Sequence, residues 1–211
     1  MAPSLSLPRV CAIMRMQRAS IDHILRAAAG ATGQAKFVLV GSAAVIVRLK
    51  PVPLNMMYTP EIDIYAPDAE DVELASEQID GSIGQGSRFH NEFGYYGDGV
   101  SPATAKMPAD WMSRAIEYRP AESPDIVVIV PDPEDVGLAK LAAWREKDQA
   151  WLTEAVNAGA ISLLKMASRL GTMPPPNSEG NPPSYEILAD RLRSLAARAK
   201  IDLVIPASDA L

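Results

Sequence analysis

The sequence predicts an α+β fold, in which a small mixed β-sheet is flanked by helices and followed by a helical C-terminal part. Short apolar, β-branched segments that suit strands, such as FVLV and DIVVIV, fall within the first 130 residues. Beyond residue 135, apolar residues recur at helical spacing, with one Pro-rich interruption. Strands that come first and helices that follow are typical of the α+β class.

The 211 residues are enough for one domain with a generous core, or for a domain with a small appendage. Changes in composition along the chain divide it into five parts. We expect an N-terminal arm at 1–18, an α/β core at 19–132, a helical part packed on that core at 133–170, a Pro-rich linker at 171–184, and a C-terminal helix and tail at 185–211.

Each element predicted in the first half has its own sequence pattern. Residues 19–29 have apolar positions at helical spacing, with Ser20 as a candidate N-cap and Gly30 as the end. The apolar segment 36–40 predicts a strand that leads into a Gly-Ser turn. The same criteria predict a helix at 43–49, a strand at 62–65, and a helix at 69–79 that Asp68 caps.

In the second half the Gly-rich region from Gly81 predicts a loop with a short strand near residues 93–96. Further strands are predicted at 113–118 and 125–130, where apolar and β-branched residues gather. Helical spacing then predicts helices at 136–144, 149–158, 161–169 and 185–199, the first of them capped by Asp135.

Charge, cysteine content and hydropathy restrict the classes of function. The net charge of −6 argues against broad, nonspecific binding of nucleic acid. The single cysteine, Cys11, cannot form an internal disulfide, which fits a reducing cytosol and predicts a cytoplasmic protein. No apolar run reaches the roughly 18–20 residues that span a bilayer, and the N-terminus lacks the pattern of a signal peptide. We therefore expect no membrane association.

Gly41 and Ser42 form a turn between the predicted strand and the short helix that follows it. Glycine allows the backbone to approach a phosphate closely, and N–H groups at a helix N-terminus favour negative charge. Glu61 and Asp63 lie two residues apart on the next strand, so their side chains share one face and can share a divalent metal. The two halves together suit a magnesium-bound nucleotide.

This order of hydrophobic strand, Gly-Ser, spacer and carboxylate pair resembles the signature of the DNA polymerase β-like nucleotidyltransferases. The chain departs from it twice: Glu61 stands where the family has Asp, and the 18-residue spacer 43–60 is longer than usual. The resemblance implies a sheet of nucleotidyltransferase type. It also implies that Gly41 and Ser42 bind a nucleotide, and that Glu61 and Asp63 bind Mg²⁺ or Mn²⁺ and are catalytic.

Two later blocks, IDGSIGQGSRFHNEFGYYGDGV and PEDVGLAKLAAWREKD, are similar to a bacterial nucleotidyltransferase-like family of unknown function. The similarity covers about residues 35–160 and extends to the nucleotidyltransferase toxins of toxin–antitoxin pairs. In those enzymes a lysine on a helix and a later aspartate complete the site. By position the resemblance implies that Lys140 and Asp148 are catalytic, and that Lys140 also binds the nucleotide.

Several of these positions keep a second interpretation. Lys140 shares a helix face with Val136 and Ala143, which favours an inward side chain, but a solvated helix lysine has the same spacing. A third carboxylate is usual in the superfamily, and both Asp125 and Asp148 are candidates for it.

Neighbouring side chains also have structural interpretations. Arg145 and Lys147 suit an exposed helix end as well as they suit a site. His90 suits either a hydrogen bond to a substrate or a role in fixing its own loop, and the structural role is favoured. Tyr95, Tyr96 and Trp111 are expected to belong to the core and not to a platform that stacks on a base.

The leading functional hypothesis is a Mg²⁺-dependent nucleotidyltransferase that uses an NTP. The acceptor is left open between an RNA 3′ end, a protein side chain and a small molecule, and a protein partner of the antitoxin kind is expected. The alternative is a noncatalytic module that retains the fold in order to bind a protein partner or a nucleotide.

Overall fold

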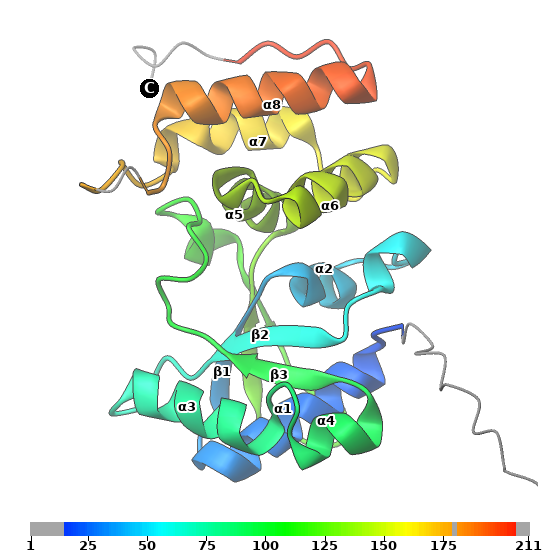
Figure 1. The fold of residues 1–211 in the computed structure, drawn as a ribbon, viewed down its shortest axis with the longest axis vertical. Helices are drawn as coiled ribbons and strands as arrows, with labels where there is room; N and C mark the ends of the chain where they lie inside the picture. Colours follow the sequence, from blue (N-terminus) through cyan, green and yellow to red (C-terminus); the bar gives the residue numbers. More distant parts are fainter. Residues whose placement is uncertain (1–14, 179–180, 206–211) are drawn as a thin grey trace, which may run out of the picture.

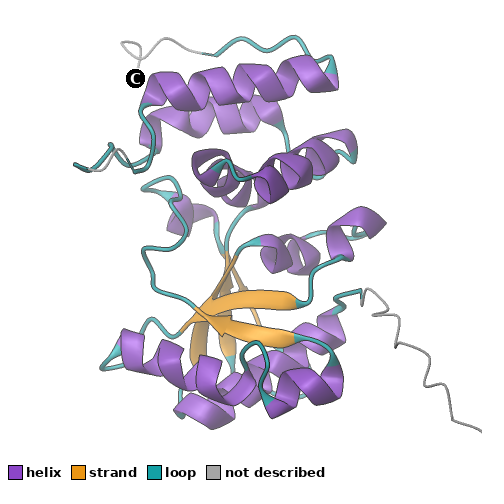
Figure 2. Cartoon of the chain, viewed as in Figure 1, coloured by secondary structure: helices purple, strands orange, loops and turns teal. Residues whose placement is uncertain are grey.

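The computed structural model describes residues 15–178 and 181–205. It consists of a mixed five-stranded sheet and eight α-helices within these residues, which confirms the predicted α+β class (Figure 2). The strands are β1 (Lys36–Val40), β2 (Glu61–Tyr65), β3 (Tyr96–Gly99), β4 (Ile116–Tyr118) and β5 (Val127–Val130). The helices are α1 (Arg18–Thr32), α2 (Ser42–Arg48), α3 (Val72–Ile83), α4 (Arg88–Phe93), α5 (Pro133–Ala143), α6 (Glu146–Asn157), α7 (Leu163–Arg169) and α8 (Tyr185–Ala199).

The strands of the sheet lie in the order β3-β2-β1-β5-β4. The central strand β1 pairs antiparallel with β2 and parallel with β5. At the edges, β3 runs parallel to β2, and β4 runs antiparallel to β5. Because β1 and β2 are antiparallel neighbours, the residue that ends β1 lies beside the middle of β2, and the Gly-Ser turn lies close to the two carboxylates.

Figure 1 shows α1, α3 and α4 together below the sheet, α2 just above it, and α5 to α8 stacked further up. Helix α1 buries Ile21, Ile24, Leu25 and Ala28, whose spacing forms one apolar stripe. The opposite face of the sheet, which carries Val38 and Val40, is covered by residues that include Val100, Met107 and Ala139. The sheet is therefore packed on both faces, and the candidate site residues Gly41, Glu61 and Asp63 lie where the end of β1 meets the first half of β2.

The bounds of several helices differ from the prediction. Helix α1 begins after Gln17 and ends at Gly33, so neither Ser20 nor Gly30 bounds it. Helix α3 is capped by Asp71, whose side chain accepts a hydrogen bond from the backbone N–H of Leu74. Asp68 is not the cap because its carboxylate instead forms an ion pair with Lys36 at 3.2 Å.

The Gly-rich region holds more structure than predicted. Ser87 accepts a hydrogen bond from the His90 N–H and so begins α4, a helix where a loop was expected. The short strand predicted near residues 93–96 is β3, which lies further along the chain at Tyr96–Gly99. As expected, His90 fixes its loop, since its Nδ1 accepts a hydrogen bond from the N–H of Gly86. The strand predicted at 113–118 is shorter, because residues 111–114 form a 3-10 turn.

Helix α5 begins at Pro133, three residues earlier than predicted, because Asp132 and not Asp135 is the N-cap. Pro133 at the first helical position supports this start. Helix α8 has the predicted bounds, Tyr185–Ala199, and buries an apolar stripe that includes Leu188, Leu192 and Leu195. No helix within the described ranges is long and apolar enough to cross a membrane.

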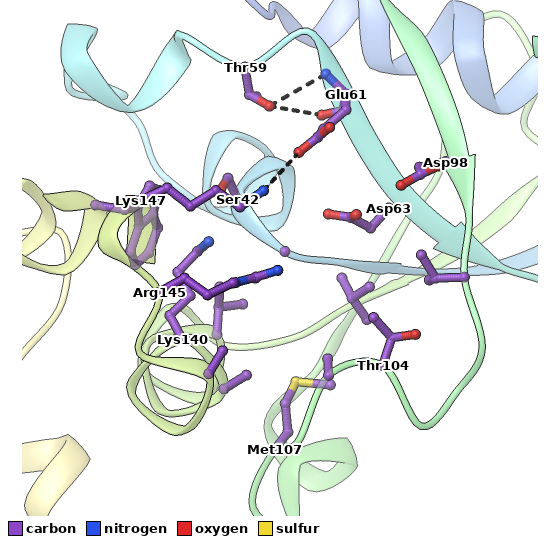
Figure 3. A pocket seen from close by; sticks show the side chains of 18 of the residues that line it. Ser42, Thr59, Glu61, Asp63, Asp98, Thr104, Met107, Lys140, Arg145 and Lys147 are labelled. Atoms are coloured by element: carbon purple, nitrogen blue, oxygen red, sulfur yellow. Dashed lines mark hydrogen bonds and ion pairs between the residues drawn. The ribbon is translucent and has the colours of Figure 1, made fainter. Parts of the chain in front are cut away.

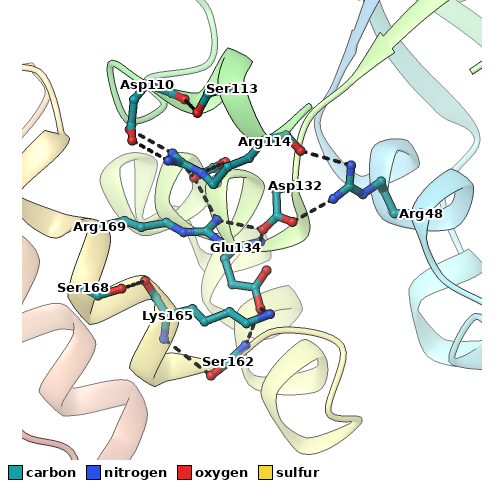
Figure 4. Close-up of polar contacts among 11 residues, drawn as sticks. Arg48, Asp110, Ser113, Arg114, Asp132, Glu134, Ser162, Lys165, Ser168 and Arg169 are labelled. Carbon is teal, nitrogen blue, oxygen red and sulfur yellow. Dashed lines mark hydrogen bonds and ion pairs between the residues drawn. The ribbon is translucent and has the colours of Figure 1, made fainter. Parts of the chain in front are cut away.

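A network of ion pairs joins the C-terminal helices to the sheet region (Figure 4). Asp135 is fully buried and accepts hydrogen bonds from Arg114 at 2.9 Å and Arg169 at 3.1 Å. Asp132 binds Arg48 of α2 at 2.8 Å and Arg169 of α7 at 2.7 Å. The network therefore links α2, the turn before β4, α5 and α7, and it fixes the position of α5 against the sheet.

Candidate active site

A cavity of ≈460 Å³ opens where the upper ends of β1 and β2 face α5 and the start of α6 (Figure 3). Five of the six residues that the sequence assigned to a site line it: Gly41, Ser42, Glu61, Asp63 and Lys140. The sixth, Asp148, is fully buried and does not line the cavity. Segments that are about 100 residues apart in the sequence thus contribute to one site.

Gly41 connects β1 to α2 with a φ of 70°, a conformation that side chains other than glycine rarely adopt. In the sheet, Val40 is paired with Asp63, so the turn lies directly beside that carboxylate. A Cβ atom at position 41 would overlap Oδ2 of Asp63. β1 and β2 are thus neighbouring strands, and Ser42 and Asp63 line the same cavity.

Glu61 and Asp63 project from the same face of β2, as their spacing predicted. The Tyr96 hydroxyl donates a hydrogen bond of 2.6 Å to Oε2 of Glu61, and Oε1 of Glu61 lies 3.9 Å from Lys147 Nζ. At the start of the strand, the Thr59 hydroxyl donates to the backbone carbonyl of Glu61. Glu61 is therefore held in place by its neighbours, and Tyr96 is buried as expected.

A further carboxylate, Asp98, lines the cavity and was missed by the sequence analysis. It lies on β3 directly opposite Asp63 in the register of the two parallel strands. Neither sequence candidate for a third carboxylate is there: Asp125 precedes β5, at the end of the sheet where β1 begins, and Asp148 does not reach the cavity. The only sequence signal for Asp98 is an acidic residue between two glycines in YGDG.

Burial and neighbouring carboxylates raise the pKa of two acidic side chains in the cavity. Burial raises the pKa of Asp63 to about 6, with repulsion from Glu61 and Asp98 adding to the shift and Lys140 and Lys147 opposing it. The pKa of Asp98 is also raised, first by burial and then by Asp80 and Glu61. Any cation bound between these side chains would relieve the repulsion.

The donor set fits a hard divalent cation. Mg²⁺ prefers carboxylate and phosphate oxygens, and proteins commonly hold it through one or two carboxylates plus the phosphates of a substrate. Glu61 and Asp63 supply such oxygens, and both line the cavity. Among the described residues, no group of three or more His, Cys, Asp or Glu side chains forms a complete metal site. The pair thus suits a metal that arrives with a phosphate ligand.

Cationic side chains lie across the cavity from the carboxylates. The side chain of Lys140, 15% exposed, points inward as its helix face predicted, and its Nζ lies 5.0 Å from the centre of the Trp151 ring. Burial lowers the pKa of Lys140, while Asp148 and Asp63 oppose the shift. Arg145 and Lys147 also line the cavity, although the sequence suited an exposed helix end equally well.

The rest of the lining is largely apolar. Along one side the cavity contacts Val100, Ala105, Met107, Val136 and Ala139. An apolar wall next to a few charged groups is typical of a small-molecule site, where the wall holds the body of the ligand and the charged groups fix its orientation.

Comparison with known proteins agrees with this geometry. A family model described as "Nucleotidyltransferase of unknown function (DUF6036)" matches residues 19–174, which include every residue of the cavity lining. Searches of curated proteins and of solved structures found no match. On the extent of the family match, the chain belongs to this family of nucleotidyltransferases.

Proposed function

We propose that the protein is a Mg²⁺-dependent nucleotidyltransferase that transfers a nucleotidyl group from an NTP to an acceptor hydroxyl. The observation that carries the proposal is the arrangement of opposite charges across one cavity. Glu61 and Asp63 lie on one side, next to the Gly41-Ser42 turn, and Lys140 lies on the other. Membership of a nucleotidyltransferase family supports the same reaction.

Glu61 and Asp63 would hold the cation, for which Mn²⁺ can substitute. When bound, the cation would supply positive charge that offsets the negative charge developing on the phosphates. Lys140 binds the phosphate tail as a point charge. Gly41 leaves room for the Asp63 carboxylate, which a side chain at this position would displace, and its backbone borders the cavity that would take the phosphates. The apolar wall holds the nucleoside.

In the reaction, the acceptor oxygen forms a bond to the α-phosphorus, and the bond from that phosphorus to the β-phosphate oxygen breaks. Pyrophosphate leaves, and the acceptor hydroxyl loses its proton. Asp98 lines the cavity next to Asp63, so it is positioned to accept that proton as a general base. The protein contributes chiefly positioning and charge, which is sufficient for phosphoryl-type transfer.

A noncatalytic, ligand-binding module is the second candidate, and one observation favours it. Glu61 replaces the aspartate of the superfamily signature, and one of its oxygens already accepts a hydrogen bond from Tyr96. A module of this kind would bind nucleotide without releasing pyrophosphate. Release of pyrophosphate therefore distinguishes the two functions.

The resemblance to toxin-associated enzymes extends the proposal to a cellular role: the protein acts in the cytoplasm as the toxic member of a pair whose other member is a protein. Induced expression of the wild-type chain should then arrest growth, whereas induced Asp63→Asn should not. Equal growth of both strains, at equal protein levels, would remove the toxin role and leave the chemistry to be tested separately.

The reaction is tested by incubating the protein with each α-labelled NTP and Mg²⁺, in the presence of total RNA, total protein or a small-molecule extract. Label in one fraction identifies the acceptor class and the preferred nucleotide. If pyrophosphate is not released with any nucleotide, although the protein is heat-stabilised by NTP and Mg²⁺, the noncatalytic alternative is correct.

A further inference from the structure

The Asp148 carboxylate contacts two of the cations that line the cavity but does not line it. It accepts hydrogen bonds from Arg145 Nε at 2.7 Å and Arg145 Nη2 at 3.4 Å, and from Lys140 Nζ at 3.2 Å. Its side chain is fully buried. An oxygen in this position has no open side toward a metal or a substrate, so its partners are the two cations themselves.

The local fold brings these three residues together. Helix α5 ends at Ala143, Trp144 takes a left-handed conformation with a φ of 54°, and Arg145 is the N-cap of α6. The N–H of Asp148 then donates to the carbonyl of Arg145 at 2.9 Å. This sharp break between two helices places the first turn of α6 beside the last turn of α5, so that Asp148 faces Lys140.

Both cations depend on Asp148 for their positions. Lys140 is largely buried, and burial and Arg145 both disfavour its charged form, while Asp148 favours it. The side chain of Arg145 is 63% exposed, and within the described residues its hydrogen bonds are to Asp148. Without Asp148, the side chain would be free to move into solvent. Because none of these bonds uses Nη1, that group is available to a ligand in the cavity.

We infer that Asp148 is a positioning residue that holds Lys140 and Arg145 as a two-cation clamp, and that Arg145 is a second phosphate-binding residue. This inference depends on the proposed function, since it assumes that the cavity takes the phosphate tail of an NTP. The planar guanidinium of Arg145 can bind two phosphate oxygens at once, whereas Lys140 supplies a point charge. The cations face Glu61 and Asp63, so a polyphosphate fits between the clamp and the carboxylates.

The test is the binding of inorganic tripolyphosphate to the full chain in EDTA, measured by calorimetry. Asp148→Asn and Arg145→Gln should each weaken binding about tenfold, the size of one charge-assisted hydrogen bond. For Asp148→Asn, simple Coulombic attraction predicts the opposite sign, because loss of a negative charge makes the cavity more positive. Weaker binding is therefore specific to a positioning role.

Arg145→Lys gives a second measurement, since it retains the charge but loses the planar fork. When Asp148 is present, Arg145→Lys should bind tripolyphosphate more tightly than Arg145→Gln does. In an Asp148→Asn background the two variants at position 145 should bind equally weakly, because the introduced lysine then has no carboxylate to hold it. If Asp148→Asn does not fold, the exposed Arg145 variants still test the clamp. With Mg²⁺ and NTP, all these variants should raise KM more than they lower kcat.

The chain offers a matched control in Asp190 and Arg193 of α8. They form an ion pair of the same sequence separation at 2.7 Å, and neither residue lines the cavity. Asp190→Asn and Arg193→Gln should leave tripolyphosphate binding unchanged, which separates the clamp from a general effect of surface charge.

Equal or tighter binding of tripolyphosphate by Asp148→Asn would overturn the inference, and so would a wild-type protein that does not bind tripolyphosphate. If the variants weaken binding as expected but no nucleotidyl transfer is found with any NTP, the clamp stands and the proposed reaction fails. The two claims are thus tested by different results.

Discussion

The backbone of Gly41 lies against the carboxylate of Asp63, so closely that a Cβ at position 41 would overlap Oδ2 of that side chain. Gly41 also has a φ of 70°, so glycine is required both for its conformation and for the space it leaves. The Gly41-Ser42 turn and the proposed metal ligand Asp63 therefore determine each other's positions.

Gly41→Ala should destabilise the protein and abolish nucleotide binding. Gly33→Ala is the comparison, since Gly33 has a φ of 69° and a ψ of 7°, and a Cβ at that position would meet no atom within 4 Å. Gly33→Ala should lose about 1–2 kcal/mol from the left-handed conformation alone. Gly41→Ala should lose about 1–3 kcal/mol more, because a φ of 70° with a ψ of −159° is less accessible to alanine and because the new Cβ collides with Asp63. Urea unfolding measures both, and equal losses would show that the contact with Asp63 has no energetic role.

Asp63→Asn should stabilise the metal-free protein at neutral pH. The pKa of Asp63 is about 6 in the folded protein against an ordinary value of 3.8, so the unfolded chain ionises this group more easily. Stability from the protonated group is fully present below pH 3.8 and is lost as the pH rises through 6. The difference corresponds to roughly 3 kcal/mol at most.

Urea unfolding in EDTA at about pH 4.5 and about pH 7.5 checks this prediction, since the two values lie on either side of the folded-state pKa. The free energy of unfolding of Asp63→Asn should exceed that of the wild type by more at the higher pH than at the lower one. At the higher pH, addition of Mg²⁺ and NTP in place of EDTA should make the wild type the more stable protein. An advantage that is the same at both pH values would show that the ionised carboxylate is not under repulsion.

Lys140→Gln should weaken nucleotide affinity by about 1–3 kcal/mol, because a charge-assisted hydrogen bond to phosphate is lost. The loss should be greater for a triphosphate than for a monophosphate. Lys147 is the comparison, since its side chain is 66% exposed and lies 3.9 Å from Glu61. Lys147→Gln should cost less than half as much in calorimetry. If neither variant differs from wild type with any nucleotide, Lys140 has no part in binding.

Asp135→Asn should destabilise the protein by about 3–5 kcal/mol, because it leaves Arg114 and Arg169 without their buried partner. Asp110 also pairs with Arg114, but its side chain is 50% exposed, so Asp110→Asn should cost under about 1 kcal/mol. Denaturant unfolding separates the two, and comparable losses would show that burial does not set the strength of this network.

Much of the site could be predicted from the sequence because its signals are local. The turn at Gly41 and Ser42 follows an apolar strand, and the alternation of Glu61 and Asp63 requires only that β2 is a strand. Lys140 was assigned from its position in the resemblance to toxin-associated enzymes, and the periodicity of its helix favoured an inward side chain. Such patterns depend on neighbouring residues and can be recognised without knowledge of the tertiary structure.

Asp98 could not be found in this way, because β3 has little strand propensity of its own. In YGDG the glycines are present for packing: a Cβ at Gly97 would meet Ile24 and Ile83, and one at Gly99 would meet the backbone of Ser76. The strand forms because helices α1 and α3 approach it closely and because β2 offers an edge to pair with. Only the assembled sheet places Asp98 beside Asp63.

The roles of the acidic residues around α5 were hidden for the same reason. The sequence predicted Asp135 as the cap of this helix, but Arg114 and Arg169 reach its carboxylate from distant segments, and Asp132 is the cap. These long-range ion pairs have no local pattern. By resemblance Asp148 was expected to be catalytic, whereas in the structure Lys140 and Arg145 bind its buried carboxylate.

The central claim is nucleotidyl transfer that depends on Asp63, and paired labels test it most directly. Wild-type protein with Mg²⁺ and acceptor should transfer the label of an α-labelled NTP to that acceptor, while the label of a γ-labelled NTP should appear in pyrophosphate. Asp63→Asn should do neither. Transfer of the γ-label to the acceptor, or equal transfer of the α-label by wild type and Asp63→Asn, would contradict the account.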